Sequence, residues 1–185
     1  MNFPNSTYLG YAFNGSSPRI HFRPLKADDF AKWTEFMQDE EAIRFFPAFK
    51  STEAEINARN WISKQLDRYK NGGFGMLALI EKDSNEFIGQ CGLLTQEVNG
   101  KMEIEVGYSL LRKHWGMGYA SESAIFMKKW AFENVNIDSI ISIIKMDNEA
   151  SKTVALKNGM YPDADLNWKD IEVTIFRISN PNFDL

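Results

Sequence analysis

The sequence predicts a single α+β domain, with a mixed and mostly antiparallel sheet of about six or seven strands flanked by helices. A chain of 185 residues has the length of one domain and can bury roughly 70% of the surface that its unfolded form exposes. Hydrophobic residues make up 44% of the chain and charged residues 25%, which is typical of a globular protein. The periodic segments follow the order strand, two helices, three strands, helix, strand, helix, strand. This order indicates a mixed α/β sheet and not a doubly wound fold.

The first part of the chain is predicted as one strand and two helices. Residues 19–23 alternate polar and apolar side chains, the period of a half-buried strand. Residues 27–37 repeat apolar side chains at three- and four-residue spacing, the period of an amphipathic helix. A second helix is expected to begin at the Ser-Thr pair at 51–52, with Glu55 in capping-box position after the threonine, and to end at the Asn-Gly-Gly stretch 71–73.

The middle of the chain is predicted as three antiparallel strands. Residues 76–80 and 87–94 are apolar runs joined by an Asp-Ser-Asn turn, and an Asn-Gly turn leads into a third strand at 102–110. Side chains of a strand alternate between its two faces, so Glu103 and Glu105 are expected to point the same way.

The last part of the chain is predicted as a helix, a strand, a helix and a strand. An apolar stripe marks a helix over 120–135, and residues 140–144 are apolar on both faces, as in a central strand. Asn148 is expected to cap a helix that closes at Gly159, and the final strand covers residues 171–178.

Composition argues against several classes of protein. With a formal charge of −4 and scattered basic residues, we expect no nucleic-acid partner. Cys91 is the single cysteine, which favours a reducing cytoplasm over a disulfide framework. No run reaches membrane-spanning length and the first residues lack the pattern of a signal peptide, so we expect a cytoplasmic protein without a membrane partner. Residues 1–17 are assigned to an N-terminal extension, 18–180 to the domain and 181–185 to a C-terminal tail.

The stretch 112–120 is the strongest ligand-site candidate in the sequence. Gly116 and Gly118 stand between a predicted strand and a predicted helix. Glycine lets a backbone approach a ligand closely, and a helix N-terminus offers unpaired N–H groups and a positive dipole end, which together suit a phosphate. An ordinary strand-to-helix turn can show the same two glycines.

Three linked motifs resemble those of the GNAT superfamily of N-acetyltransferases. They are E-V-G-Y at 105–108, W-G-M-G-Y-A-S-E at 115–122 and N-E-A-S at 148–151, and the resemblance covers about residues 19–178. It is greatest to the branch that acetylates the N-termini of ribosomal proteins, where the same motifs occur in this order.

The resemblance implies a splayed sheet that binds acetyl-CoA as co-substrate, with no metal. The pantetheine arm would follow the strand that ends at Leu110, and the pyrophosphate would rest on backbone N–H groups of the glycine loop. Lys113 stands where the superfamily pattern [QR]-x-x-G-x-[GA] has Gln or Arg, the usual long polar side chain. It either adds charge to this site or is a solvated surface lysine. The residues expected to bind the cofactor are Leu110, Leu111, Lys113, Trp115, Gly116, Met117, Gly118, Tyr119, Ala120, Asn148 and Ser151, with the free N–H groups supplied by Lys113, Trp115, Gly116, Met117 and Gly118.

The same resemblance implies the catalytic residues. Glu105 is the first choice for the general base, acting through water, and Glu103 is the second, although a strand carboxylate can simply face solvent or pair with a basic neighbour. Ser151 matches a serine that could donate to the CoA sulfur, and Asn148 matches an asparagine that bonds the pantetheine; both residues also suit an ordinary helix start. Ala155 occupies the position where many members carry a tyrosine that acts as the general acid and protonates the departing thiolate.

The predicted reaction is direct transfer of an acetyl group to a primary amine in a ternary complex. A protein N-terminus or a small-molecule amine is favoured as the acceptor, because deprotonating an α-amine at neutral pH costs about 1.4 kcal/mol and a lysine about 4.6; a lysine side chain stays open as an alternative. Four aromatic side chains fall where substrate-lining helices are expected, or they belong to the core: Phe45, Phe46, Phe49 and Trp61. The superfamily also favours a homodimer.

Two other functions stay open at this point. Ala155 and Lys113 also fit a CoA-binding or regulatory module that has lost catalysis. A nucleotide hydrolase is disfavoured, because the glycine loop lacks G-K-[ST]. Cys91 is expected to be a small buried residue and not an acylated nucleophile. Glu122 is expected to face away from the glycine loop, since a carboxylate would repel a phosphate.

Overall fold

The computed structural model describes residues 13–46 and 51–183. In chain order its elements are β1 (Gly15–Ser16), β2 (Ile20–Pro24), the 3₁₀ turn η1 (Ala27–Asp29), α1 (Phe30–Gln38), α2 (Glu40–Ile43), α3 (Ala54–Lys70), β3 (Met76–Glu81), β4 (Phe87–Val98), β5 (Lys101–Leu110), the 3₁₀ turn η2 (Arg112–His114), α4 (Tyr119–Asn134), β6 (Ser139–Lys145), α5 (Glu149–Lys157), β7 (Tyr161–Trp168) and β8 (Ile171–Ser179).

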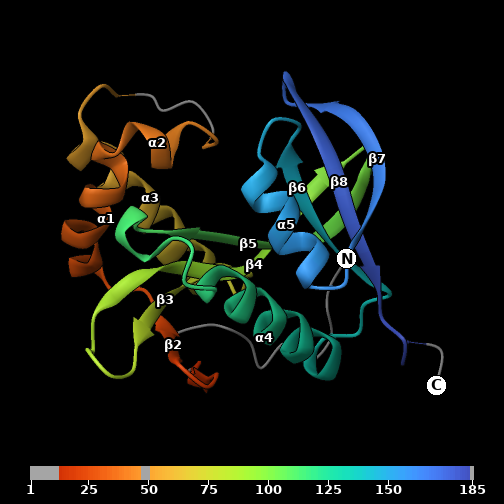
Figure 1. Ribbon diagram of the computed structural model, residues 1–185, viewed down its shortest axis with the longest axis horizontal. Helices are drawn as coiled ribbons and strands as arrows, with labels where there is room; N and C mark the ends of the chain where they lie inside the picture. Colours follow the sequence, from red (N-terminus) through yellow and green to blue (C-terminus); the bar gives the residue numbers. More distant parts are fainter. Residues whose placement is uncertain (1–12, 47–50, 184–185) are drawn as a thin grey trace.

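The strands form one sheet in the order β1-β2-β3-β4-β5-β6-β8-β7 (Figure 1). Every neighbouring pair is antiparallel except β5 and β6, which are parallel. The predicted mixed, mostly antiparallel sheet flanked by helices is therefore confirmed. The sheet has eight strands in the described part of the chain, against the six or seven expected.

The two unpredicted strands lie at the edges of the sheet. β1 falls within the expected N-terminal extension, whose first twelve residues lie outside the described part, and it pairs with β2. β7 is mostly exposed and carries Asp163, Asp165 and Asn167, so its sequence lacks an apolar face. Charged and polar side chains are common on edge strands, where they discourage pairing with other chains, and this is why the segment does not look like a strand.

Different helices cover the two faces of the sheet. One core contains Trp33 of α1 and Ile62 of α3 together with Leu94 of β4. The other contains Met127 of α4 and Ala155 of α5 together with other residues of the central strands. Within the described part, no helix is long and apolar enough to cross a membrane.

Helix starts differ from the sequence prediction in two places. The capping box proposed at Thr52 is wrong, because Glu53 is the N-cap residue of α3 and makes no side-chain capping bond. Ser51 instead accepts the N–H of Glu53 at 3.0 Å and so stabilises the turn before the helix. The short helix α2 was not predicted; Asp39 caps it by accepting two N–H groups of its first turn.

β5 and β6 part from one another halfway along their length. Their one register pair is Glu105 with Ile141. Beyond it, β5 stays paired with β4 as far as Leu110, and β6 stays paired with β8 as far as Lys145. Figure 1 shows β6 and β8 turning away from β4 and β5. We call the space between the C-terminal halves of β5 and β6 the strand opening.

Arg177 of β8 fastens the closed end of this parting. Its guanidinium donates to both carboxylate oxygens of Glu103 on β5 at 3.1 Å, to Ser139 on β6 at 2.8 Å and to Asp163 on β7 at 2.7 Å. Burial opposes the charge of Arg177, but the hydrogen bonds to Glu103 and Asp163 outweigh it and raise its pKa. One side chain thus ties four strands together where the opening begins.

We expect Arg177→Ala to lower the free energy of unfolding by about 1.5–3 kcal/mol, because the buried Glu103 carboxylate loses two hydrogen bonds from the guanidinium and keeps only the exposed Lys101, 3.3 Å away. The Glu103 side chain is only 7% exposed. Urea denaturation would measure the loss, with Lys129→Ala as control, since Lys129 pairs with Glu133 at the surface and should contribute less than about 1 kcal/mol. A loss in Arg177→Ala no larger than in the control would contradict the role of this clamp.

Candidate active site

The edge of β5 in the strand opening presents backbone groups without a strand partner. The N–H of Leu111 donates to the carbonyl of Ile88 at 3.0 Å, which fixes the alternation of the antiparallel ladder. Residues 105, 107 and 109 accordingly turn their backbone groups toward β4, whereas Tyr108 and Leu110 turn theirs toward the opening. The two carbonyl oxygens accept from Ser109 Oγ and Trp115 Nε1 at 2.8 Å, so this edge can bind an extended ligand through its N–H groups.

The glycine loop lies next to this edge. Gly116 and Gly118 have φ of +74° and +84°, a region that favours glycine, and Gly118 is the N-cap residue of α4. The N–H groups of Gly116, Met117 and Gly118 donate no hydrogen bond to any group among residues 13–46 and 51–183. The N–H of Trp115 was expected to be free as well, but it donates to the carbonyl of Arg112 at 3.0 Å in the η2 turn. Three successive N–H groups at a helix N-terminus form a site for an anion.

Hydrogen bonds anchor the start of α4 to the residues just before β2. Glu122 accepts from the Ser17 hydroxyl at 2.7 Å and from the N–H and Nε of Arg19 at 2.8 and 2.7 Å. Arg19 also donates to the carbonyl of Met117 at 3.0 Å and lies over the buried ring of Tyr119, 4.4 Å from its centre. Glu122 therefore faces away from the free N–H groups, as predicted, and helps to fix the loop.

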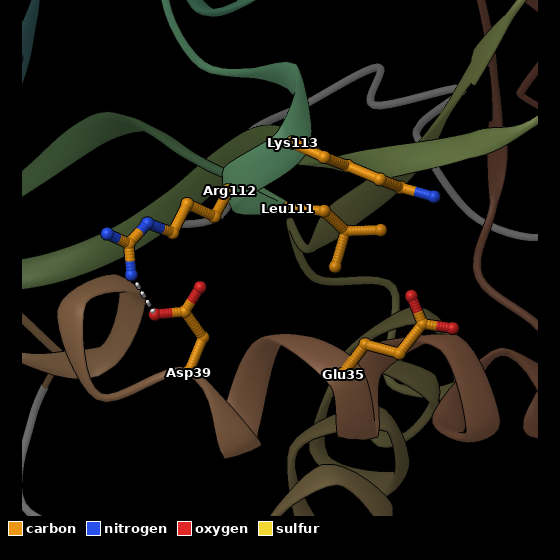
Figure 2. Close-up of a pocket in the computed structure, with 5 residues that line it drawn as sticks. All are labelled: Glu35, Asp39, Leu111, Arg112 and Lys113. Carbon is orange, nitrogen blue, oxygen red and sulfur yellow. Dashed lines mark hydrogen bonds and ion pairs between the residues drawn. The ribbon is translucent and has the colours of Figure 1, made fainter.

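Lys113 turns its ammonium group toward Glu86, with which it forms an ion pair at the surface. The hydrogen bond between them raises the pKa of Lys113 and lowers that of Glu86. Figure 2 shows Lys113 and Arg112 extending in opposite directions from the end of β5. They border a hollow of about 430 Å³. The hollow is lined by Glu35, Asp39, Leu111, Arg112 and Lys113. Arg112 donates to Asp39 at 3.3 Å across this hollow. Acidic side chains of the α1 region therefore face the residues that follow β5.

Glu105 lies at the mouth of the opening on the face that α3 covers. It is half-buried and accepts from Gln96 Nε2 at 2.7 Å and from the N–H of Ile143 on β6 at 3.4 Å. Burial raises the pKa of Glu105, although these two hydrogen bonds and the charge of Arg68 oppose the rise. Glu103, on the same face, has both oxygens bound by Arg177.

Tyr108 and Ser151 meet at the other face of the opening. The Tyr108 hydroxyl lies 2.9 Å from Ser151 Oγ and 3.0 Å from the Ser151 carbonyl oxygen. Burial raises the pKa of Tyr108, although its bond with Ser151 opposes the rise. Asn148 is the predicted N-cap of α5, since its side chain accepts the N–H of Ser151 at 3.0 Å. Ala155 is buried in the core between α5 and the sheet.

Tyr108 is the site residue that sequence reasoning missed. It appeared there only as one letter of the E-V-G-Y motif. Its even position on β5 was the available signal, because it places the phenol on the opposite face from Glu105, where α5 carries Ser151.

Two of the four aromatic side chains predicted near the substrate, Phe46 and Trp61, are partly buried and pack against the core. Phe46 and Trp61 pack with ring centres 4.8 Å apart, and Trp61 donates to Gln90 at 2.9 Å. Phe45 packs against the guanidinium of Arg44, and Phe49 lies outside the described residues. Phe46 and Trp61 pack against the core on the same face of the sheet as Glu105. Within the described ranges, no three His, Cys, Asp or Glu side chains are grouped so as to hold a metal ion.

Comparison with known proteins gives a family match over most of the chain. Residues 19–161 match the acetyltransferase (GNAT) domain. The chain is 31% identical to the uncharacterized N-acetyltransferase YoaA of Bacillus subtilis, over 76% of this chain and 78% of YoaA.

Solved structures share the fold. An acetyltransferase from Agrobacterium tumefaciens superposes with a TM-score of 0.74 at 25% identity, covering 90% of this chain and 94% of that one. RimL, a ribosomal L7/L12 alpha-N-protein acetyltransferase in complex with coenzyme A, superposes with a TM-score of 0.73 at 16% identity, covering 89% of this chain and 96% of that one.

We expect Cys91 to be inert toward thiol reagents in the folded protein. It is fully buried, and burial raises its pKa to about 12, so almost no thiolate forms at neutral pH. Reaction with a chromogenic disulfide should be slow in buffer and complete in urea. Rapid modification of the native protein would contradict the buried placement and reopen a covalent role for this thiol.

Proposed function

Because the chain belongs to the GNAT family of acetyltransferases, we propose that this enzyme transfers the acetyl group of acetyl-CoA to a primary amine by direct attack in a ternary complex. The observation that carries the proposal is the strand opening, which has a carboxylate at one mouth and two hydroxyl groups at the other. A thioester in this opening would have Glu105 on the side of the attacking amine, and Ser151 on the side of the departing sulfur.

The backbone supplies most of the proposed cofactor site. A carbonyl oxygen of the pantetheine would accept the N–H of Leu110 on the open edge of β5, beside Asn148 of α5. The pyrophosphate would accept the N–H groups of residues 116–118 at the positive end of α4. Lys113 is paired with Glu86, and the proposed phosphate site consists of backbone N–H groups without the Lys113 ammonium. The bound coenzyme A of the RimL structure supports the assignment of the cofactor.

Glu105 is the proposed general base. The amine must lose a proton before or during attack. Burial raises the pKa of Glu105, which makes the carboxylate a stronger base for this step. Glu103 is the weaker candidate, because accepting a proton would break its two hydrogen bonds to Arg177. The N–H group of Tyr108, which faces the opening, would stabilise the developing oxyanion, an effect often worth about 3 kcal/mol per donor.

The proposed acceptor is an α-amine of a peptide N-terminus or of a small molecule. An α-amine needs about 3 kcal/mol less than a lysine to lose its proton at neutral pH, which suits one half-buried carboxylate acting through water. RimL, which shares the fold, is named as an alpha-N-protein acetyltransferase. A homodimer, a cytoplasmic location and the boundaries of the domain at residues 18 and 180 stay predictions.

A screen of acetyl-CoA consumption over N-terminal peptides, polyamines, aminoglycosides and amino acids tests the proposed activity. Acetylation of any amine would exclude the alternative of a catalytically impaired CoA-binding module. Binding of acetyl-CoA without turnover of any acceptor would favour that module, and binding of ATP instead would favour a nucleotide enzyme.

We expect Gly116→Trp to abolish acetyl-CoA binding, because an indole at this position would cover the free N–H groups of the loop. Isothermal titration calorimetry measures the effect. Gly72→Trp is the matched control: Gly72 has a similar φ of +69°, and an added Cβ meets nothing within 4 Å at either position. Equal loss of binding in both variants would point to general unfolding.

We expect Glu105→Gln to lower kcat/KM roughly 10²–10⁴-fold while acetyl-CoA still binds. A base acts in its deprotonated form, so the wild-type rate should fall as the pH is lowered through the pKa of Glu105. Because burial raises this pKa, the fall should occur at a higher pH than the ordinary glutamate pKa of about 4.3. This acid limb should vanish in Glu105→Gln and persist in Glu97→Gln, an exposed carboxylate on β4. An unchanged rate in Glu105→Gln would assign the base elsewhere.

A further inference from the structure

The hydroxyl of Ser151 is engaged by another hydroxyl group. Tyr108 reaches it from β5, across the opening that separates this strand from α5. The phenolic oxygen is within hydrogen-bonding distance of two oxygens of the same residue, Ser151 Oγ at 2.9 Å and the Ser151 carbonyl at 3.0 Å. Tyr108 can therefore exchange acceptors by rotating its O–H bond, without moving a heavy atom.

The two positions of the phenol hydrogen have opposite effects on Ser151. When Tyr108 donates to the carbonyl oxygen, its own lone pair can accept the Ser151 hydroxyl, which is then occupied. When Tyr108 donates to Ser151 Oγ, the serine hydrogen is released and can be donated to a third atom. A hydrogen bond received at Oγ also polarises the serine O–H and makes it a stronger donor.

Full proton transfer from the phenol to a departing thiolate is unfavourable. An ordinary tyrosine has a pKa of about 10 and a thiol about 8.5, so the transfer is disfavoured by roughly thirtyfold before burial is considered. Burial raises the pKa of Tyr108 further, against the opposing effect of its bond with Ser151. The buried Cys91 thiol on β4 and Ser151 on α5 lie on the same face as the phenol, and the charge of Glu105 acts on it from the opposite face of its own strand. Tyr108 therefore remains a neutral hydrogen-bond donor.

We propose that Tyr108 is a positioning residue that controls the Ser151 hydroxyl: it holds this hydroxyl in the ligand-free enzyme and releases it toward the sulfur as the thioester bond breaks. The proposal rests on the proposed acetyl transfer. In that step the C–N bond forms and the C–S bond breaks, and the bonding electron pair leaves with the sulfur. The amine proton moves toward Glu105, and the thiolate leaves unprotonated, stabilised by the Ser151 O–H.

A double-mutant cycle tests the proposal. Tyr108→Phe keeps the ring and removes one hydroxyl, and we expect it to lower kcat about tenfold with KM for acetyl-CoA within about twofold. Ser151→Ala should lower kcat at least as much. In the Ser151→Ala background, Tyr108→Phe should lower kcat no further, because its effect passes through the serine. Tyr161→Phe, which removes the hydroxyl of an exposed tyrosine, is the matched control and should be unchanged.

A second measurement separates positioning from a structural staple. The pKa of the CoA thiol in the binary complex, followed by thiolate absorbance, should be higher in Tyr108→Phe than in the wild-type protein and unchanged in Tyr161→Phe. Independent, additive effects of the two substitutions, or an unaltered thiol pKa, would overturn the proposal while leaving the acetyltransferase activity in place. If the wild-type protein bound no CoA, the proposed function would fail together with this inference.

Discussion

The parting of β5 and β6 is the constraint on which the rest of the structure depends. Two parallel strands pair at Glu105 and Ile141 and then separate, each held by its own antiparallel neighbour. Arg177 fixes the closed end by binding Glu103, and the continuous ladders on either side keep the open end from closing. Inside the opening, the carbonyl oxygens of Tyr108 and Leu110 accept from Ser109 Oγ and Trp115 Nε1 at 2.8 Å, so the N–H groups of this edge are what an extended ligand can complement.

Alternation along β5 distributes the chemistry between the two faces of the sheet. Glu105 and Tyr108 are three residues apart and therefore point to opposite faces, the first toward α3 and the second toward α5. Burial acts on both groups in the same direction, because it disfavours the charged form of each. The consequences differ: the carboxylate becomes a better proton acceptor, whereas the phenol becomes a weaker acid. One strand can thus supply a base at one mouth and a neutral donor at the other.

Local features could be predicted from the sequence, and contacts between distant segments could not. The Asn148 cap and the positive φ of Gly116 and Gly118 follow from neighbouring residues alone. The bond between Tyr108 and Ser151 joins positions 43 residues apart, and the pair of Arg177 with Glu103 joins positions 74 apart, so neither leaves a periodic signal. The N–H of Trp115 was miscounted as free because motif matching does not reveal the η2 turn that binds it. The polar edge strand β7 was missed because it has no buried face.

The charges around the glycine loop explain why its backbone N–H groups contribute more than its cationic side chains to attracting an anion. Lys113 is paired with Glu86, and Arg19 is divided between Glu122 and the carbonyl of Met117. Burial opposes the charge of Glu122, but its bonds to Arg19 and Ser17 lower its pKa, so the carboxylate stays ionised and keeps Arg19 in place. The nearby side-chain charges are therefore largely compensated in pairs. The N–H groups of residues 116–118 and the dipole of α4 remain to attract an anion, and the left-handed conformation that aligns these groups requires glycine at two of the three positions.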